Sequence, residues 1–137
     1  MMPTPAQLRK LEAAARAAAG RAYAPYSRFA VGAAVLTTAG KVHTGCNVEN
    51  ASYGLTNCAE RTAVFSAVAA GGARTRLRCV VVYTPTRTAT APCGACRQVI
   101  HEFGPSSRIV SICDGPARVD SPIDALLPGA FGPADLA

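Results

Sequence analysis

The sequence predicts an α/β fold with three layers (α/β/α), in which helices cover both faces of a mixed five-stranded sheet. Apolar runs of strand length alternate with helix-forming stretches, and one short connection is typical of a hairpin. A strand–helix–strand order later in the chain predicts a crossover connection. At 137 residues, with 50% apolar and 16% charged residues, the chain has the size and composition of a single globular domain, residues 1–137.

A helix and two strands are predicted in the N-terminal part of the chain. Strong helix formers occupy residues 6–22, with apolar side chains at helical spacing, and Gly20 lies near the point where such a helix should end. The apolar run at residues 30–36 predicts a buried strand. A short connection joins it to a second strand at residues 42–48, so we expect an antiparallel hairpin.

The rest of the chain is predicted to alternate between helices and strands. Polar residues at 49–57 predict a loop, and helix-forming residues resume at 58–70 before a pair of glycines ends that helix. The continuous apolar run at residues 77–83 has the length of a buried strand, and a loop follows at residues 85–92. The remaining predicted elements are a helix at 94–103, a strand at 108–112, a short strand at 117–119 and a small helix at 122–127.

A formal net charge of +6 is compatible with nucleic-acid binding, but the distribution of charge does not favour it. The arginines are scattered from Arg9 to Arg118, and no basic run is interleaved with aromatic residues. No stretch approaches the ~20 apolar residues of a membrane span. We therefore expect neither a nucleic-acid partner nor insertion into a membrane.

Six cysteines are compatible with a disulfide-linked secreted domain, but the N-terminal sequence does not favour secretion. The Ala-rich stretch at residues 13–19 is similar to the apolar core of a signal peptide, yet Glu12 and Arg16 disturb that pattern. A transit peptide stays open as an alternative to a packed first helix. Because a chain of this length builds a core without disulfides, we expect a reducing compartment, the cytoplasm.

Two short motifs predict a zinc site with three thiolate ligands, one zinc ion per chain. Cys58 stands two residues before Glu60, and Cys93 and Cys96 form a Pro-Cys-x-x-Cys motif with the preceding proline. Three ligands leave the fourth tetrahedral position of zinc to water, which is typical of a catalytic site. A redox pair is the alternative for Cys-x-x-Cys alone, and the upstream Cys-Ala-Glu motif favours the metal.

The other cysteines and both histidines lack the spacing of metal ligands. Cys46, Cys79 and Cys113 fall in or beside predicted strands, where a thiol packs as a small hydrophobic side chain. His43 and His101 have no second candidate ligand nearby. We interpret both histidines as surface or packing residues.

Glu60 and Arg61 have the residue types that such a zinc site needs beside its ligands. A carboxylate at Glu60 can take a proton from the attacking water and return it to the substrate. Zinc with three thiolates carries a formal charge of −1, and a guanidinium at Arg61 can offset that charge by donating to the sulfurs. The alternative for Arg61 is an ordinary solvated arginine on a helix.

The chain resembles the cytidine deaminase family, specifically its small homotetrameric type with three cysteines at the zinc. The resemblance covers almost the whole chain. The motifs that carry it are Tyr23-Ala24-Pro25-Tyr26-Ser27, Phe29 with Val31-Gly32-Ala33-Ala34, Gly45-Cys46-Asn47-Val48-Glu49-Asn50, Asn57-Cys58-Ala59-Glu60-Arg61-Thr62, Pro92-Cys93-Gly94-Ala95-Cys96-Arg97-Gln98 and Leu126-Leu127-Pro128-Gly129-Ala130-Phe131.

The resemblance implies a role for each of these segments. Glu60 would shuttle protons, and Cys58, Cys93 and Cys96 would bind zinc, with Arg61 beside the ligands. The implied substrate-binding residues are Phe29, Asn47, Val48, Glu49 and Phe131, of which Asn47 and Glu49 would hold the ribose hydroxyls, Phe29 would pack on the base, and Phe131 would reach a neighbouring subunit's site.

The function that follows is zinc-dependent hydrolytic deamination of cytidine and deoxycytidine, with release of ammonia, in pyrimidine salvage. One alternative is a deaminase for another aminopyrimidine nucleoside such as blasticidin S, although the Asn-Val-Glu-Asn motif at 47–50 favours a ribose. A second alternative is a non-catalytic zinc-stabilised binding domain, in which Cys46, Cys79 or Cys113 closes the fourth zinc position.

Overall fold

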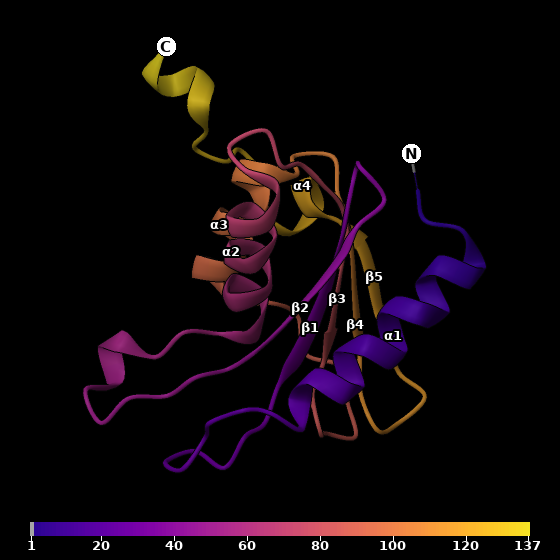
Figure 1. The fold of residues 1–137 in the computed structure, drawn as a ribbon, viewed down its shortest axis with the longest axis vertical. Coiled ribbons are helices and arrows are strands. Elements are labelled where there is room, and N and C mark those ends of the chain that lie inside the picture. The colour runs from indigo at the N-terminus through magenta and orange to yellow at the C-terminus, as the bar shows by residue number, and fades with distance from the viewer. Residues whose placement is uncertain (1) are drawn as a thin grey trace.

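The centre of the molecule is one five-stranded sheet with the strand order β2-β1-β3-β4-β5, in a computed structural model that describes residues 2–137 (Figure 1). Neighbouring strands are antiparallel, except for the parallel pair β3 and β4. The mixed sheet confirms the predicted fold class. The strands are β1 (Gly32–Thr37), β2 (Val42–Cys46), β3 (Leu77–Tyr83), β4 (Arg108–Ile112) and β5 (Val119–Pro122).

Helices cover both faces of this sheet, as predicted (Figure 1). Helix α1 packs on one face, and α2, α3 and α4 pack on the other. The helices are α1 (Pro5–Ala19), α2 (Ala59–Gly71), α3 (Gly94–Phe103) and α4 (Ile123–Leu126), with short 3₁₀ turns at Tyr53–Leu55 and Pro133–Leu136. Of the described helices, none combines the length and the apolar character needed to cross a bilayer.

The central strand β3 is apolar on both faces, which explains why its sequence is a continuous run rather than an alternating one. Val80 and Val82 pack into the core beneath α2 and α3. Cys79 and Val81 pack on the opposite face with Leu11 of α1. A strand buried on both sides fixes the position of its carboxyl end, from which one wall of the candidate site is built.

Two glycines bring the helices unusually close to the sheet. A Cβ atom on Gly45 of β2 would lie 2.3 Å from the backbone nitrogen of Ala63 in α2, and a Cβ atom on Gly32 of β1 would lie 1.9 Å from the carbonyl oxygen of Ala15 in α1. Only a residue without a side chain fits at either position. The close contact at Gly45 holds α2 against the edge strand.

Helix α1 begins at Pro5 because Thr4 and Gln7 form a reciprocal cap. The Thr4 hydroxyl accepts the Gln7 N–H at 3.1 Å, and the Gln7 side-chain oxygen accepts the Thr4 N–H at 2.9 Å. The helix ends at Ala19, earlier than the predicted residue 22, since Gly20 already leaves the helical hydrogen-bond pattern. Its amphipathic face and its start were readable from the sequence, and its end was predicted three residues too late.

Several element boundaries differ from the prediction for identifiable reasons. The strand predicted at 42–48 ends at Cys46, because the Asn47 side chain bonds to the backbone of residues 29 and 31 and Val48 pairs with Asn57 instead. The strand predicted at 30–36 begins at Gly32. The strand predicted at 117–119 lies at 119–122, where it pairs with β4, and the helix predicted at 122–127 spans 123–126. The elements at 77–83, 94–103 and 108–112 are confirmed.

Candidate active site

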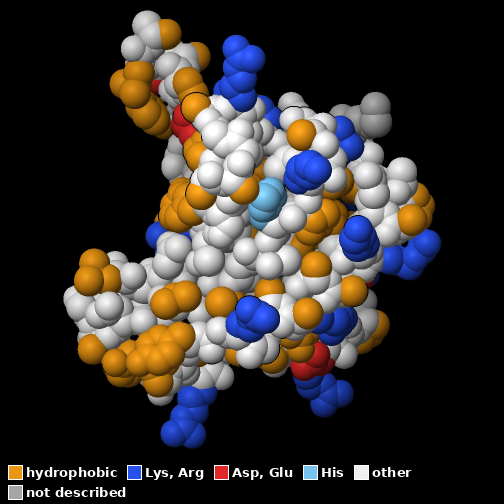
Figure 2. All heavy atoms as spheres, viewed as in Figure 1, with side chains coloured by type: hydrophobic (Ala, Val, Ile, Leu, Met, Phe, Trp, Pro, Cys, Tyr) orange, Lys and Arg blue, Asp and Glu red, His pale blue; other side chains and the backbone are white. Residues whose placement is uncertain are grey.

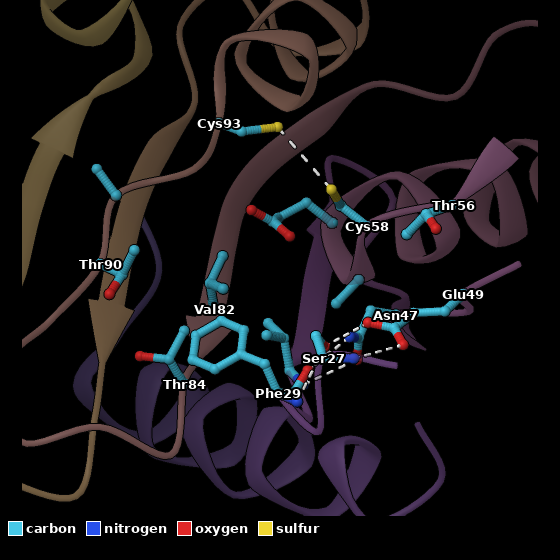
Figure 3. Close-up of a pocket in the computed structure, with 14 residues that line it drawn as sticks. Ser27, Phe29, Asn47, Glu49, Thr56, Cys58, Val82, Thr84, Thr90 and Cys93 are labelled. Atoms are coloured by element: carbon cyan, nitrogen blue, oxygen red, sulfur yellow. Dashed lines mark hydrogen bonds between the residues drawn. The ribbon is translucent and has the colours of Figure 1, made fainter. Parts of the chain in front are cut away.

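Three cysteine sulfurs meet where α2 and α3 begin. The Sγ atoms of Cys58, Cys93 and Cys96 all lie within 4.8 Å of one another, and those of Cys58 and Cys93 are 3.9 Å apart (Figure 3). Within residues 2–137 this is the one cluster of His, Cys, Asp or Glu side chains able to share a metal ion. Cys46, Cys79 and Cys113 lie outside it, so no fourth thiol closes the set.

Both helices present their amino ends to this cluster. Cys58 is the N-cap residue of α2 and Cys93 that of α3, and neither helix start has a side-chain capping bond. Free backbone N–H groups and the positive end of each helix dipole therefore face the sulfurs. This environment favours thiolates, which are the form of cysteine that binds metal.

The electrostatics of the cluster call for a cation. A hydrogen bond from Cys96, together with the hydrogen bond and charge of Arg61, lowers the pKa of the Cys58 thiol to about 5. The pKa of Cys96 is raised in turn, because it donates to the Cys58 sulfur and is buried. Because Cys58 already carries a negative charge as a thiolate, a second thiolate beside it is stable only with a positive ion among the sulfurs. Three thiolates with an open fourth position form a ligand set that fits zinc.

Glu60 lies in the first turn of α2, inside the cavity that adjoins the sulfurs. Only 5% of its surface is exposed. Burial, with a smaller contribution from the negative charge of Cys58, raises the pKa of this carboxyl to about 7, against the opposing effects of a backbone hydrogen bond and of Arg61. A carboxyl that titrates near neutral pH is suited to both accepting and donating a proton.

The cavity has a volume of about 250 Å³ and is bounded by segments that are distant in sequence (Figure 3). They are the loop before β1, the segment after β2, the start of α2, the end of β3 and the loop before α3. Its walls combine apolar surface with a few polar groups, as in small-molecule sites generally. The lining residues are Ser27, Phe29, Val31, Asn47, Glu49, Thr56, Cys58, Ala59, Glu60, Val82, Thr84, Thr90, Ala91 and Cys93.

Asn47 and Glu49 line this cavity and also hold the loop that carries Phe29. The Asn47 side chain donates to the Phe29 carbonyl at 2.6 Å and accepts the Val31 N–H at 2.9 Å. Glu49 accepts the Tyr26 N–H at 2.9 Å and is also hydrogen-bonded by the Ser27 hydroxyl and N–H. The Ser27 hydroxyl lowers the pKa of Glu49, which keeps this carboxylate ionised.

The predicted substrate-binding residues divide into those that line the cavity and those that do not. The Phe29 ring points into the cavity, toward the wall formed by Val82 and Thr84 (Figure 3). Val48 is 44% exposed and lies outside the lining, because side chains alternate along extended backbone and those of residues 47 and 49 face inward. Phe131 is 57% exposed and also lies outside, with its carbonyl accepting from Gln98 at 2.9 Å.

Sequence reasoning missed several residues that shape the site. Thr84 and Thr90 line the cavity wall opposite α2, and Ser27 joins Glu49 at its mouth. Arg97 donates to the Pro92 carbonyl at 2.7 Å and to the Leu126 carbonyl at 2.8 Å, so it supports the loop that carries Cys93. Only Ser27 and Arg97 had a signal in the sequence, since both stand in the motifs that resemble the family.

Comparison with known proteins assigns the chain to a family. Residues 5–113 match the model of the cytidine and deoxycytidylate deaminase zinc-binding region. The cytidine deaminase of Sporosarcina psychrophila is 45% identical over 128 residues, which cover 93% of each chain. That of Mycobacterium tuberculosis H37Rv is 50% identical over 124 residues, which cover 90% of this chain and 87% of the relative.

The fold agrees with this assignment. The crystal structure of cytidine deaminase from Burkholderia pseudomallei superimposes with a TM-score of 0.84 at 51% identity and covers 90% of this chain and 98% of that one. The structure from M. tuberculosis gives a TM-score of 0.75 at 44% identity, with 91% and 97% covered. The zinc-binding family model and the three-thiol cluster together identify zinc as the cofactor, one ion per chain. The chain belongs to the cytidine and deoxycytidylate deaminase family.

Proposed function

We propose that residues 1–137 act as one catalytic domain that deaminates cytidine and deoxycytidine by hydrolysis, giving uridine or deoxyuridine and ammonia. The observation that carries this proposal is the convergence of three thiols and the buried Glu60 at one cavity in a chain of the deaminase family. The relatives that are up to 50% identical are named cytidine deaminases, which supports cytidine as the substrate.

Cys58, Cys93 and Cys96 hold the zinc ion in this proposal. Bound zinc supplies a nucleophile at neutral pH by lowering the pKa of a water molecule. The helix amino ends favour the thiolate form of the N-cap residues Cys58 and Cys93, and a bound zinc ion would hold Cys96 as a thiolate as well. Arg61 donates from Nη2 to the Cys58 sulfur at 3.3 Å and reduces the negative charge of the ligand set.

Glu60 moves the protons of the reaction. Its carboxylate accepts a proton from the attacking water and passes it to the ring nitrogen beside the reacting carbon. Glu60 then takes the proton of the hydroxyl group added to the carbon and passes it to the amino group, so the C–N bond breaks, ammonia leaves and the product carbonyl forms. Burial raises the pKa of Glu60 in the zinc-free chain, which favours this role because a buried carboxyl holds a transferred proton at a lower free-energy cost than an exposed one.

The loop before β1 and the segment after β2 orient the nucleoside in this proposal. Phe29 packs against the pyrimidine ring, and Asn47 and Glu49 hydrogen-bond the ribose hydroxyls. Both polar side chains are already held in place by the backbone of residues 26–31, so they lose little conformational freedom when the sugar binds. Val48 has a supporting rather than a direct role, since it holds the 47–49 segment through its backbone pairing with Asn57.

The active assembly in this proposal is a homotetramer in which Phe131 completes a neighbouring site. The segment after α4 extends away from the sheet and carries Phe131 at 57% and Leu136 at 81% exposure (Figure 1). Large apolar side chains on an extended segment favour docking on another chain. A neighbour's phenyl ring over the cavity would exclude water from the reacting base.

The two alternatives are less well supported. A non-catalytic zinc domain needs a fourth protein ligand, whereas Cys46, Cys79 and Cys113 all lie outside the sulfur cluster. A blasticidin S deaminase is less consistent with relatives named cytidine deaminases. We place the reaction in pyrimidine salvage and in the cytoplasm, where six free thiols are stable.

The proposal is tested with the purified zinc-loaded chain and a panel of cytidine, deoxycytidine, cytosine and blasticidin S. Loss of cytidine absorbance with equal release of ammonia is the expected result for the two nucleosides. Conversion of blasticidin S alone would show that blasticidin S, and not cytidine, is the substrate. Conversion of none of the four would favour the zinc-stabilised binding domain.

A further inference from the structure

A second cavity, of about 210 Å³, lies at the opposite end of the sheet from the candidate active site. The active-site cavity adjoins the start of β1 and the amino end of α2. The second cavity adjoins the end of β1, the hairpin into β2, the carboxyl end of α2 and the loop before β3. The two cavities have no lining residue in common, so the second needs an explanation of its own.

The titratable side chains in the wall of this second cavity are all basic. Lys41 and His43 line it from the hairpin and β2, and Arg74 and Arg76 line it from the loop after α2. No carboxylate is among the lining residues. Figure 2 shows blue Lys and Arg side chains around a pale-blue histidine on one face, while the visible red acidic side chains lie near the C-terminal segment and the lower edge.

These cations are not neutralised by the chain itself. The ion pairs within residues 2–137 are Arg16–Asp114, Arg108–Asp120 and Arg118–Glu12, and none involves Lys41, Arg74 or Arg76. Like charges in a concave wall repel one another and focus a positive potential into the cavity. An anion in the cavity removes that repulsion.

Capping of the α2 carboxyl end explains only part of the arrangement. The Thr75 hydroxyl donates to the Gly72 carbonyl at 2.8 Å, and Arg76 donates to the carbonyls of Ala73 and Thr75 at 3.3 and 2.7 Å. The side chains of Lys41 and Arg74, by contrast, donate to no group in the described part of the chain. Two basic side chains on one cavity therefore remain free to bind a ligand.

A fifth basic residue, Arg78, contacts a residue that lines the cavity. Arg78 donates from Nη2 to the Thr38 carbonyl at 3.1 Å, and Thr38 lines the cavity. The Nε atom of Arg78 is buried and has no acceptor within residues 2–137. The charge of Arg78 adds to the positive potential of the cavity, and no described carboxylate forms an ion pair with it.

We propose that this cavity binds a phosphate group, either free phosphate or the phosphate of a mononucleotide. Arg74, from the loop after α2, contributes a planar guanidinium, which matches phosphate oxygens in a bidentate manner, and Lys41, from the hairpin, contributes an ammonium on a flexible stem. The site is separate from the deaminase cavity and does not depend on the proposed reaction. A concave wall of this size takes one phosphate group rather than an extended chain of them.

The test uses the zinc-loaded protein and calorimetric titration with inorganic phosphate and with adenosine 5′-monophosphate, each at constant ionic strength. A purine nucleotide is chosen because it is not a substrate class of the deaminase cavity. The double variant Lys41→Gln/Arg74→Gln removes the two free cations. The matched control Arg9→Gln/Lys10→Gln removes the same charges from the exposed surface of α1.

We expect phosphate to bind the wild-type chain and the control equally, and the double variant about tenfold more weakly or not at all. Equal affinity for phosphate and nucleotide would assign the site to phosphate alone, and tighter nucleotide binding would assign it to a nucleotide. Cytidine turnover by the double variant should equal that of the control. Equal phosphate binding by all three proteins, or binding of neither phosphate nor the nucleotide to the wild-type chain, would overturn the proposal.

Discussion

The guanidinium of Arg61 donates from Nη2 to the sulfur of Cys58 across 3.3 Å. The two residues are three positions apart at the start of α2, so the helix itself brings them together. The contact stabilises negative charge on the sulfur and contributes to the low pKa of Cys58. In the proposed zinc site, this contact would link a metal ligand to a residue outside the three-cysteine cluster.

Replacing Arg61 should weaken zinc binding without unfolding the chain. Loss of a partner that orients and polarises a metal ligand typically costs about 10–100-fold in affinity or activity. We expect Arg61→Gln to show a loss of that size in competition with a zinc chelator, and Arg61→Lys to recover part of it. The same affinity in Arg61→Gln and in Arg9→Gln would show that the contact is incidental.

Replacing Glu60 should abolish turnover and leave the metal in place. The carboxylate of Glu60 is absent from the sulfur cluster, so zinc content in Glu60→Gln should equal that of the wild type. Proton transfer by such a group contributes about 10²–10⁴-fold to the rate, and kcat should fall by at least that factor. Glu102→Gln on exposed α3 surface is the control. Wild-type kcat in Glu60→Gln would remove Glu60 from the mechanism.

The burial of Glu60 also predicts a pH-dependent stability. Its pKa in the folded zinc-free chain is about 7, against an ordinary value of 4.5. The unfolded chain loses this proton first, so ionisation destabilises the folded state as the pH rises from about 4.5 to 7. Zinc-free Glu60→Gln should therefore be more stable than the zinc-free wild type by about 3 kcal/mol near pH 8 and equally stable near pH 4. Denaturant titrations at the two pH values measure this, and a difference that does not depend on pH would contradict it.

Replacing Cys93 should remove both zinc and stability. Metal binding is coupled to folding, and two sulfurs hold zinc far less tightly than three. We expect Cys93→Ala to lose zinc and to melt at a lower temperature than the holoprotein. Cys46→Ala should keep its zinc, because Cys46 lies outside the cluster. Loss of zinc from Cys46→Ala would instead indicate a closed structural site.

Replacing Phe131 should impair catalysis without affecting zinc. If this ring completes a neighbour's cavity, Phe131→Ala should lower kcat/KM by about tenfold or more, as expected for a buried interface aromatic. Arg9→Gln, on the exposed surface of α1 and outside this segment, is the control. Light scattering should report four chains per particle for the wild type. A fully active monomer, or native kinetics in Phe131→Ala, would refute the shared site.

Local sequence patterns were sufficient to predict the bounds of elements that are set by the residues within them. Residues 77–83 form a continuous apolar run between turn residues, and 94–103 follow a Pro-Cys start with helical spacing. The end of β2 could not be predicted in this way. It depends on the Asn47 amide, which bonds to residues 29 and 31, a contact that exists only once the chain has folded.

In the candidate site, too, some residues could be predicted from local sequence patterns and others could not. Cys58, Cys93 and Cys96 stand in short motifs, so their meeting could be anticipated from residue type and spacing. Thr84 and Thr90 reach the cavity only because β3 is central and the loop before α3 folds back over its end. No local pattern marks such residues, because their role comes from tertiary position.

The most direct measurement is mass spectrometry of the product formed from cytidine by the zinc-loaded chain in water enriched in the heavy oxygen isotope. Hydrolytic deamination predicts uridine with one heavy oxygen at the carbon that carried the amino group, and one ammonia for each uridine. No product, or uridine without the heavy isotope, would contradict the central claim that this site activates water against the cytosine ring.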